Sequence, residues 1–106
     1  MTIDKELVSA AEASKRHLKK ITFGEFVRHM RTCDEVVQSE LAHRLNVSKQ
    51  YVSAVENGHR FVSIETAVQI AKALGYPPEP FVEVLLREQI RNAGLKCTVE
   101  LRKPAA

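Results

Sequence analysis

Hydrophobic residues recur three and four positions apart over much of the chain, and this interval predicts five short α-helices. The first helix begins after Thr22, which forms a capping box with Glu25. The other four helices are expected over residues 38–45, 48–57, 64–74 and 78–92. The segment between residues 22 and 92 is therefore predicted to be an all-α domain.

Polar and small residues mark the ends of these helices. Ser48 and Ser63 are good N-cap residues, because their hydroxyls accept hydrogen bonds from free backbone N–H groups. Asn46 suits a left-handed turn between the second and third helices, and Gly75 ends the fourth helix. Val37 precedes the second helix and offers no side-chain cap, so that helix is expected to fray or to find another cap.

Two segments of different character flank this domain. Residues 1–21 form a thin amphipathic arm, which is expected to be partly helical and to end in a basic cluster over residues 15–20. In residues 93–106, four apolar residues alternate with polar ones, which is the period of a β-strand. These four residues are Leu95, Cys97, Val99 and Leu101.

A single strand leaves its backbone N–H and C=O groups without partners. We expect the strand to pair antiparallel with the same strand of a second copy, across a two-fold axis. A disordered tail and pairing with a different protein are the alternatives. The expected fold is therefore a five-helix domain with an N-terminal arm and a short C-terminal β-strand used for dimerisation.

Positive charge is concentrated around the second and third helices. The chain has 106 residues, which suits one domain, and a net charge of +3. Residues 15–60 hold nine Lys or Arg against five Asp or Glu, an excess of four that is larger than the excess over the whole chain. This distribution favours an anionic partner.

The sequence disfavours several classes of protein. No run of 18 apolar residues is present, so no membrane span is expected. Cys33 and Cys97 lack metal-ligand spacing, and a reduced cytoplasmic location is the simpler interpretation. Cys33 follows His29 by four residues, but such a pair is usually incidental. We expect no metal, no cofactor, no catalytic residue and no enzymatic activity.

The stretch from Gln38 to Gly58 has the spacing of a helix-turn-helix, in which the second helix enters the major groove of DNA. Ala42 is small at the point where the two helices must cross closely. The segments VQSELAHRLNVSKQYVSAVENG and SIETAVQIAKALG resemble the lambda-repressor-like, or XRE-type, helix-turn-helix family. The resemblance covers residues 22 to about 75 and implies a five-helix DNA-binding domain that regulates transcription.

The resemblance also implies which side chains read DNA bases. Lys49, Gln50 and Ala54 lie where family members touch base edges. Gln can bond adenine N6 and N7 together, Lys can donate to guanine O6 and N7, and Ala can pack on a thymine methyl. Ser53 is a small donor on the same helix and is included with them. Phosphate binding is the alternative role for Lys49.

Six residues are expected at the DNA backbone, namely Gln38, Arg44, Ser48, Tyr51, Asn57 and Arg60. Gln38 resembles the family glutamine that grips a phosphate and braces the second helix of the motif. Arg44 and Arg60 flank the pair of helices and would favour phosphates, with solvated surface arginines as the alternative. Tyr51 either contacts the DNA backbone or covers the second helix.

Arg31 and Glu56 match an arginine and a glutamate that form an ion pair in some family members. If the pair is buried, loss of one partner would cost about 3–5 kcal/mol, because the other charge is left unpaired. If the pair is exposed, it would contribute no more than about 1 kcal/mol. The resemblance favours partial burial.

We therefore predict a homodimeric, sequence-specific DNA-binding regulator that acts as a repressor at a palindromic operator. Double-stranded DNA and a second copy are the expected partners, with a toxin or the transcription machinery as a further protein partner. The expected location is the cytoplasm, on the nucleoid when DNA is bound. The alternatives are an antitoxin that also binds DNA, and a coactivator-type protein-interaction module without DNA binding.

Overall fold

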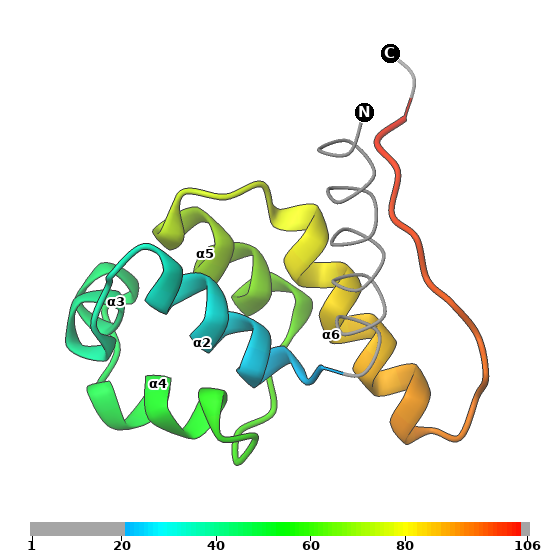
Figure 1. Cartoon of the computed structure of the whole chain (residues 1–106), viewed down its shortest axis with the longest axis horizontal. Helices are drawn as coiled ribbons and strands as arrows, with labels where there is room; N and C mark the ends of the chain where they lie inside the picture. Colours follow the sequence, from blue (N-terminus) through cyan, green and yellow to red (C-terminus); the bar gives the residue numbers. More distant parts are fainter. Residues whose placement is uncertain (1–20, 105–106) are drawn as a thin grey trace, which may run out of the picture.

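Five helices make up most of residues 21–104, the part of the chain that the computed structural model describes (Figure 1). They are α2 (Phe23–Cys33), α3 (Gln38–Leu45), α4 (Lys49–Glu56), α5 (Ile64–Leu74) and α6 (Pro78–Asn92). The all-α class and the five helices of the sequence-based prediction are confirmed. The predicted N-terminal arm, 1–21, lies outside the described residues except for Ile21, which is buried in the core.

The helix ends follow the residues that were expected to cap them. Thr22, Ser48 and Ser63 each accept a hydrogen bond from the backbone N–H three residues later, at 3.1, 3.0 and 3.2 Å. Asn46 ends α3 in the left-handed conformation, with φ 57° and ψ 46°. Val37 begins α3 without a side-chain cap. Tertiary contacts must therefore hold that end of the helix.

The core forms where α2 packs against α4, α5 and α6 at the centre of the molecule (Figure 1). Phe26 of α2 meets Phe81 of α6 edge to face, with 4.8 Å between the ring centroids. Ala67 and Ala71 of α5 are fully buried, and their small side chains let the neighbouring helices approach closely. Burial of each large apolar side chain stabilises the fold by about 1.5–3 kcal/mol.

Gly24 lets α2 contact the end of α4 directly. A Cβ atom at this position would lie 2.6 Å from the Glu56 carbonyl oxygen, and closer still to the carbonyl oxygen of Val55. Both obstacles are backbone atoms, which cannot move aside as the end of a flexible side chain can. The backbones of α2 and α4 therefore touch at a point where only glycine fits.

After α6 the chain turns back and runs along the outer side of that helix (Figure 1). Contacts recur at a regular interval and join Arg87 to Val99, Glu83 to Leu101, and Glu79 to Lys103. The Arg87 Nε donates to the Val99 carbonyl at 3.1 Å, and the Leu101 N–H donates to a Glu83 carboxylate oxygen at 2.6 Å. Four helical residues rise about 6 Å, which is close to the length of two extended residues.

This arrangement corrects the predicted C-terminal strand. Over residues 93–104 the described chain forms no strand, and side chains of α6 bind backbone groups that we expected to pair in a sheet. Leu101 packs against the helical core, whereas Leu95 and Cys97 are exposed. The alternating pattern was real, but its inward residues face a helix rather than a second strand.

Replacement of Gly24 by Ala should destabilise the protein by about 1–3 kcal/mol, because the added methyl meets fixed backbone. Helix propensity alone predicts the opposite sign, since Gly to Ala inside a helix stabilises it by about 1 kcal/mol. Urea denaturation measures the difference in unfolding free energy. The matched control is Gly94→Ala, where a Cβ meets nothing and only the positive φ of 84° is strained. A Gly24→Ala variant as stable as the wild type would contradict the proposed contact.

Candidate DNA-binding surface

Helices α3 and α4 form a compact pair joined by a short turn. The Val47 N–H donates to the Ala42 carbonyl at 2.9 Å, and this bond closes the turn around Asn46. Ala42 is buried at the crossing, as are Val52 and Val55 on the inner side of α4. The apolar residues of α4 thus face the core and leave its opposite side outward.

The four predicted base-reading residues lie on α4, which forms one edge of the molecule (Figure 1). Lys49 and Gln50 are exposed, and Ser53 and Ala54 are half-buried. Asn57 follows directly after the helix and is exposed. Residues 50, 53 and 57 are three or four positions apart, so they lie along one side of the helix. This side presents amide and hydroxyl groups.

The predicted phosphate-binding residues have different surroundings. Ser48 is the exposed N-cap of α4, at the end of the helix that carries a partial positive charge. The Arg60 guanidinium lies over the Tyr51 ring, 5.1 Å from its centroid. Tyr51 also packs against the core cluster. The ring of Tyr51 therefore supports Arg60 just beyond the end of α4.

The Arg44 guanidinium already has hydrogen-bond partners in the protein. Its Nε donates to the Glu40 carboxylate at 3.1 Å, and an Nη donates to the Ala73 carbonyl at 3.0 Å. Ala73 lies in the last turn of α5, where free carbonyls carry a partial negative charge. Arg44 thus joins α3 to α5, and these contacts compete with a role at a phosphate.

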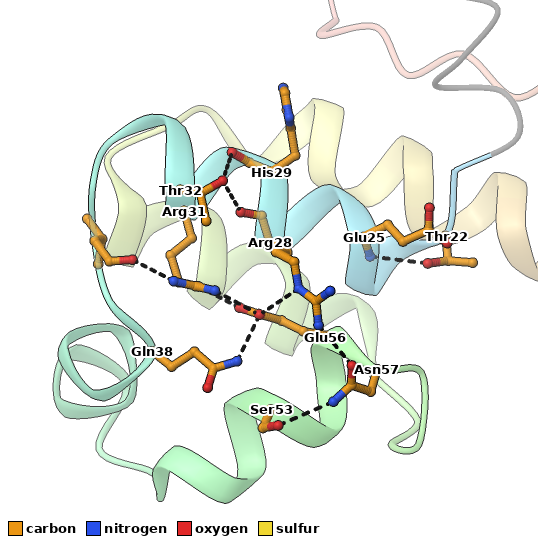
Figure 2. A network of polar contacts seen from close by, with 11 residues as sticks. Thr22, Glu25, Arg28, His29, Arg31, Thr32, Gln38, Ser53, Glu56 and Asn57 are labelled. Atoms are coloured by element: carbon orange, nitrogen blue, oxygen red, sulfur yellow. Dashed lines mark hydrogen bonds and ion pairs between the residues drawn. The ribbon is translucent and has the colours of Figure 1, made fainter.

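A buried carboxylate joins α4 to the two preceding helices (Figure 2). The Glu56 side chain is fully buried, and four nitrogen atoms donate to its two oxygens. Two of them belong to Arg31, at 2.7 and 3.0 Å. The others are Nε2 of Gln38 at 3.0 Å and Nε of Arg28 at 3.4 Å. Gln38 therefore braces α4 from the first residue of α3.

Arg31 is itself almost fully buried and reaches a third element. Its remaining Nη donates to the Val36 carbonyl at 2.8 Å, in the turn between α2 and α3. In the opposite direction, the Val36 N–H donates to the Arg31 carbonyl at 3.0 Å. One guanidinium thus holds α4 and the α2–α3 turn at the same time. The partial burial inferred from the family resemblance understates the burial of this pair.

The pKa of Glu56 is lowered by its partners. Burial alone would raise the pKa of this carboxyl, because a charge is disfavoured away from water. Hydrogen bonds from Arg31, Gln38 and Arg28, together with the Arg31 charge, more than offset that effect. Glu56 is therefore ionised in the folded protein over the whole neutral range.

Three features of this surface escaped the sequence analysis. Arg28 donates to the Asn57 Oδ1 at 2.8 Å, and the Asn57 Nδ2 donates to the Ser53 Oγ at 3.3 Å (Figure 2). The second feature is Gly24. A glycine in the first turn of a helix was the sequence signal that could have indicated a close helix contact there. Phe61 is the third, an aromatic residue that is 80% exposed.

Phe61 lies at a pocket of about 280 Å³ between the α4–α5 loop and the second half of α6. Phe23, Val55 and Leu85 contribute apolar walls, and Gln89 contributes a polar side. Ile64, three residues after Phe61, is half exposed. An exposed aromatic side chain and a hollow with apolar and polar walls thus share one face beside the end of α4.

Within residues 21–104, no three His, Cys, Asp or Glu side chains are grouped as a metal ion would require. The His29 and Cys33 side chains lie 3.7 Å apart on the surface of α2. No helix in the described part of the chain is long and apolar enough to cross a membrane.

Comparison with known proteins places this surface in a wider context. A helix-turn-helix family model matches residues 38–81. Control protein C.BamHI of Bacillus amyloliquefaciens is 32% identical over 65 residues, which are 60% of this chain and 80% of that protein. An uncharacterized transcriptional regulator in the ATPase CF(0) region of Rhodospirillum rubrum is 38% identical over 72 residues, 68% of this chain and 67% of that protein.

A solved structure is similar as well. The restriction-modification controller protein C.AhdI from Aeromonas hydrophila superposes with a TM-score of 0.53 and is 34% identical. The match covers 56% of this chain and 89% of C.AhdI. The similarity in sequence and in structure therefore extends over almost all of that protein.

Replacement of Glu56 by Gln should cost about 3–5 kcal/mol of stability at pH 7, because Arg31 is left buried without a counter-charge. The loss should depend on pH. The pKa of Glu56 is lower in the folded protein than in the unfolded chain, where it is about 4.3. The stabilisation by the carboxylate is therefore fully present above about pH 4.3 and is lost as the pH falls through the pKa of the folded protein. The gap between wild type and variant, measured by denaturant titration from pH 7 to 3, should therefore narrow below about pH 4.3.

The control is Glu40→Gln, which changes an exposed carboxylate paired with Arg44. That pair is half exposed, so its loss should cost less than about 1 kcal/mol. A Glu56→Gln gap of the same size at every pH would show that the carboxylate charge does not stabilise the fold.

Proposed function

Because the chain belongs to the lambda-repressor-like (XRE-type) helix-turn-helix family of DNA-binding transcriptional regulators, we propose that it represses transcription by binding a palindromic operator as a homodimer. The family consists of regulators and not enzymes. The single observation that supports the proposal best is the outward side of α4, where polar residues line a helix whose inner side is buried.

Base reading in this proposal is done by α4. Gln50 and Lys49 are exposed at the first turn of the helix, the part that reaches base edges in a helix-turn-helix. Ser53 and Ala54 lie one turn further and meet the flanks of the same base pairs. The Gln50 amide can bond adenine N6 and N7 together, which selects adenine over the other bases.

Phosphate contacts set the position of α4 in the groove. We propose Ser48, Tyr51, Asn57 and Arg60 for this role, since they lie at the two ends of α4. Gln38 holds α4 through its hydrogen bond to Glu56, and the second N–H of its side-chain amide can donate to a phosphate. Arg44 is the weakest member of the group, because Glu40 and Ala73 already bind its guanidinium.

The relatives suggest a narrower candidate for the regulated genes. The Aeromonas hydrophila relative is a restriction-modification controller by name, and the Bacillus amyloliquefaciens relative is a control protein. We propose control of a restriction–modification gene pair as the second candidate. Selection of bound sites from random duplexes gives the operator sequence, and the genes beside that sequence decide between this candidate and a general repressor.

The dimer in this proposal is formed by the face that carries Phe61. In a two-fold dimer each copy offers the same patch, so an exposed anchor and a pocket on one face are self-complementary. Of the four residues first predicted for dimerisation, Val99 and Leu101 are engaged with α6, and Leu95 and Cys97 can add contacts.

Replacement of Gln50 by Ala should reduce discrimination at one operator position by about 1–3 kcal/mol. Binding of wild type and variant to the selected duplex and its single-base changes, measured by fluorescence anisotropy, gives this quantity. The variant should keep the salt dependence of the wild type, because Gln50 carries no charge. Gln69→Ala, at an exposed position on α5, is the matched control. Equal weakening on every duplex would argue against base reading by Gln50.

Replacement of Phe61 by Ser should weaken the dimer by about 2 kcal/mol or more for each of the two anchors. Sedimentation velocity over a range of concentrations measures the shift toward monomer. Deletion of residues 95–106 serves as the comparison and should leave the dimer intact. Monomers after the deletion, together with an unchanged Phe61→Ser dimer, would move the interface to the C-terminal tail.

A further inference from the structure

A chain of hydrogen bonds runs from the buried Glu56 carboxylate to the outer side of α4 (Figure 2). Arg28 connects the two, because its Nε donates to Glu56 at 3.4 Å and an Nη donates to the Asn57 Oδ1 at 2.8 Å. Asn57 continues the chain through its Nδ2, which donates to the Ser53 Oγ at 3.3 Å. A residue of α2 therefore contacts Asn57 directly and is linked through it to Ser53, and both of these side chains are proposed to meet DNA.

The direction of these bonds follows from the chemistry of Arg28. A guanidinium offers only donors, so the Asn57 atom that faces it must be the carbonyl oxygen. The amide nitrogen of Asn57 is then turned toward Ser53 and the outer side of α4. One of its two hydrogens goes to the Ser53 Oγ, and the second has no acceptor among the described residues, so it can donate to a group outside the protein.

Asn57 determines whether the Ser53 hydroxyl acts as a hydrogen-bond donor or acceptor. Its oxygen accepts from the Asn57 amide, and among the described residues none accepts the Ser53 O–H in return. The hydroxyl is thus left to donate. If Asn57 turned its carbonyl oxygen to Ser53 instead, the hydroxyl would donate inward and could only accept from DNA.

We propose that Arg28 is a positioning residue that fixes Asn57 and Ser53 as hydrogen-bond donors toward DNA. This inference rests on the proposed function of the α4 surface. Phosphate oxygens are acceptors, which suits the outward N–H of Asn57. In the major groove a donor hydroxyl favours guanine O6 or N7, adenine N7 and thymine O4, and disfavours the amino group of cytosine. Arg28 thereby affects base preference without contact with a base.

The energetic context supports a role in orientation. Arg28 is half exposed, and its bond to Glu56 is the longest of the four that this carboxylate accepts. The fold therefore depends less on Arg28 than on Arg31. Its shorter bond, to Asn57, involves a charged donor and is of the stronger kind.

The test uses Arg28→Met, Asn57→Ala and the double variant on the full chain, with the selected duplex and its single-base changes as probes. Arg28→Met should weaken binding by about two- to tenfold and reduce the preference at one base position by a similar factor. In the Asn57→Ala background the same change should have no further effect, because its target is gone. Arg28→Lys, which still offers only donors, should keep most of the preference.

Two results would overturn the inference. The first is an Arg28→Met variant with wild-type affinity and base preference. The second is additive loss in the double variant, together with a fall of about 0.9 in the slope of log K against log salt, which would make Arg28 a phosphate ligand itself. Wild-type protein that selects no preferred duplex would refute the proposed function instead. The side-chain amide signals of Asn57 in ¹⁵N spectra of the free protein should shift in Arg28→Met and not in Arg28→Lys, so the orientation is testable without DNA.

Discussion

The buried Glu56 carboxylate is the interaction on which the arrangement of this protein depends. Helices of eight residues, such as α3 and α4, are not stable alone in water. Glu56 lies at the last turn of α4 and accepts hydrogen bonds from α2 and from the first residue of α3. Gly24 brings the α2 backbone against the same turn. The angle at which α4 leaves the core is therefore set by one charged contact and one steric contact.

A buried ion pair is a poor source of net stability, since both charges lose their hydration. The buried ion pair instead fixes the geometry of the helices. The free-energy cost of removing the two charges from water is offset only when the charged groups are well hydrogen-bonded to each other and to neighbouring groups. Each of the three side-chain nitrogen atoms of Arg31 meets an acceptor, with two bonds to Glu56 and one to the Val36 carbonyl. At the surface, Arg44 links the other short helix to α5, with one bond to Glu40 and one to the Ala73 carbonyl. Each helix of the pair is thus held to a neighbouring element by an arginine that also binds a backbone carbonyl.

Much of this fold could be predicted from the sequence, because its signals are local. The period of the apolar residues indicates the five helices, and Thr22, Ser48 and Ser63 mark the starts of three of them. The candidate surface on α4 followed from the same period, since residues that do not face the core must face outward. The role of Gly24 could not be predicted, because it depends on the crossing point of two helices distant in sequence. The contact of Arg44 with the Ala73 carbonyl could not be predicted either, because it depends on where α5 ends in space.

The C-terminal segment shows why a correct pattern led to a wrong element. Alternation of Val99 and Leu101 with polar residues indicates an extended chain with one apolar side, but not what covers that side. Helix α6 covers that side. Its residues Glu79, Glu83 and Arg87 are four positions apart and therefore match every second residue of the C-terminal segment. Charged side chains of a helix can bind the backbone groups that a sheet would otherwise pair. An alternating segment that follows a helix with such a charged stripe is therefore better interpreted as a strap along that helix than as a dimerisation strand.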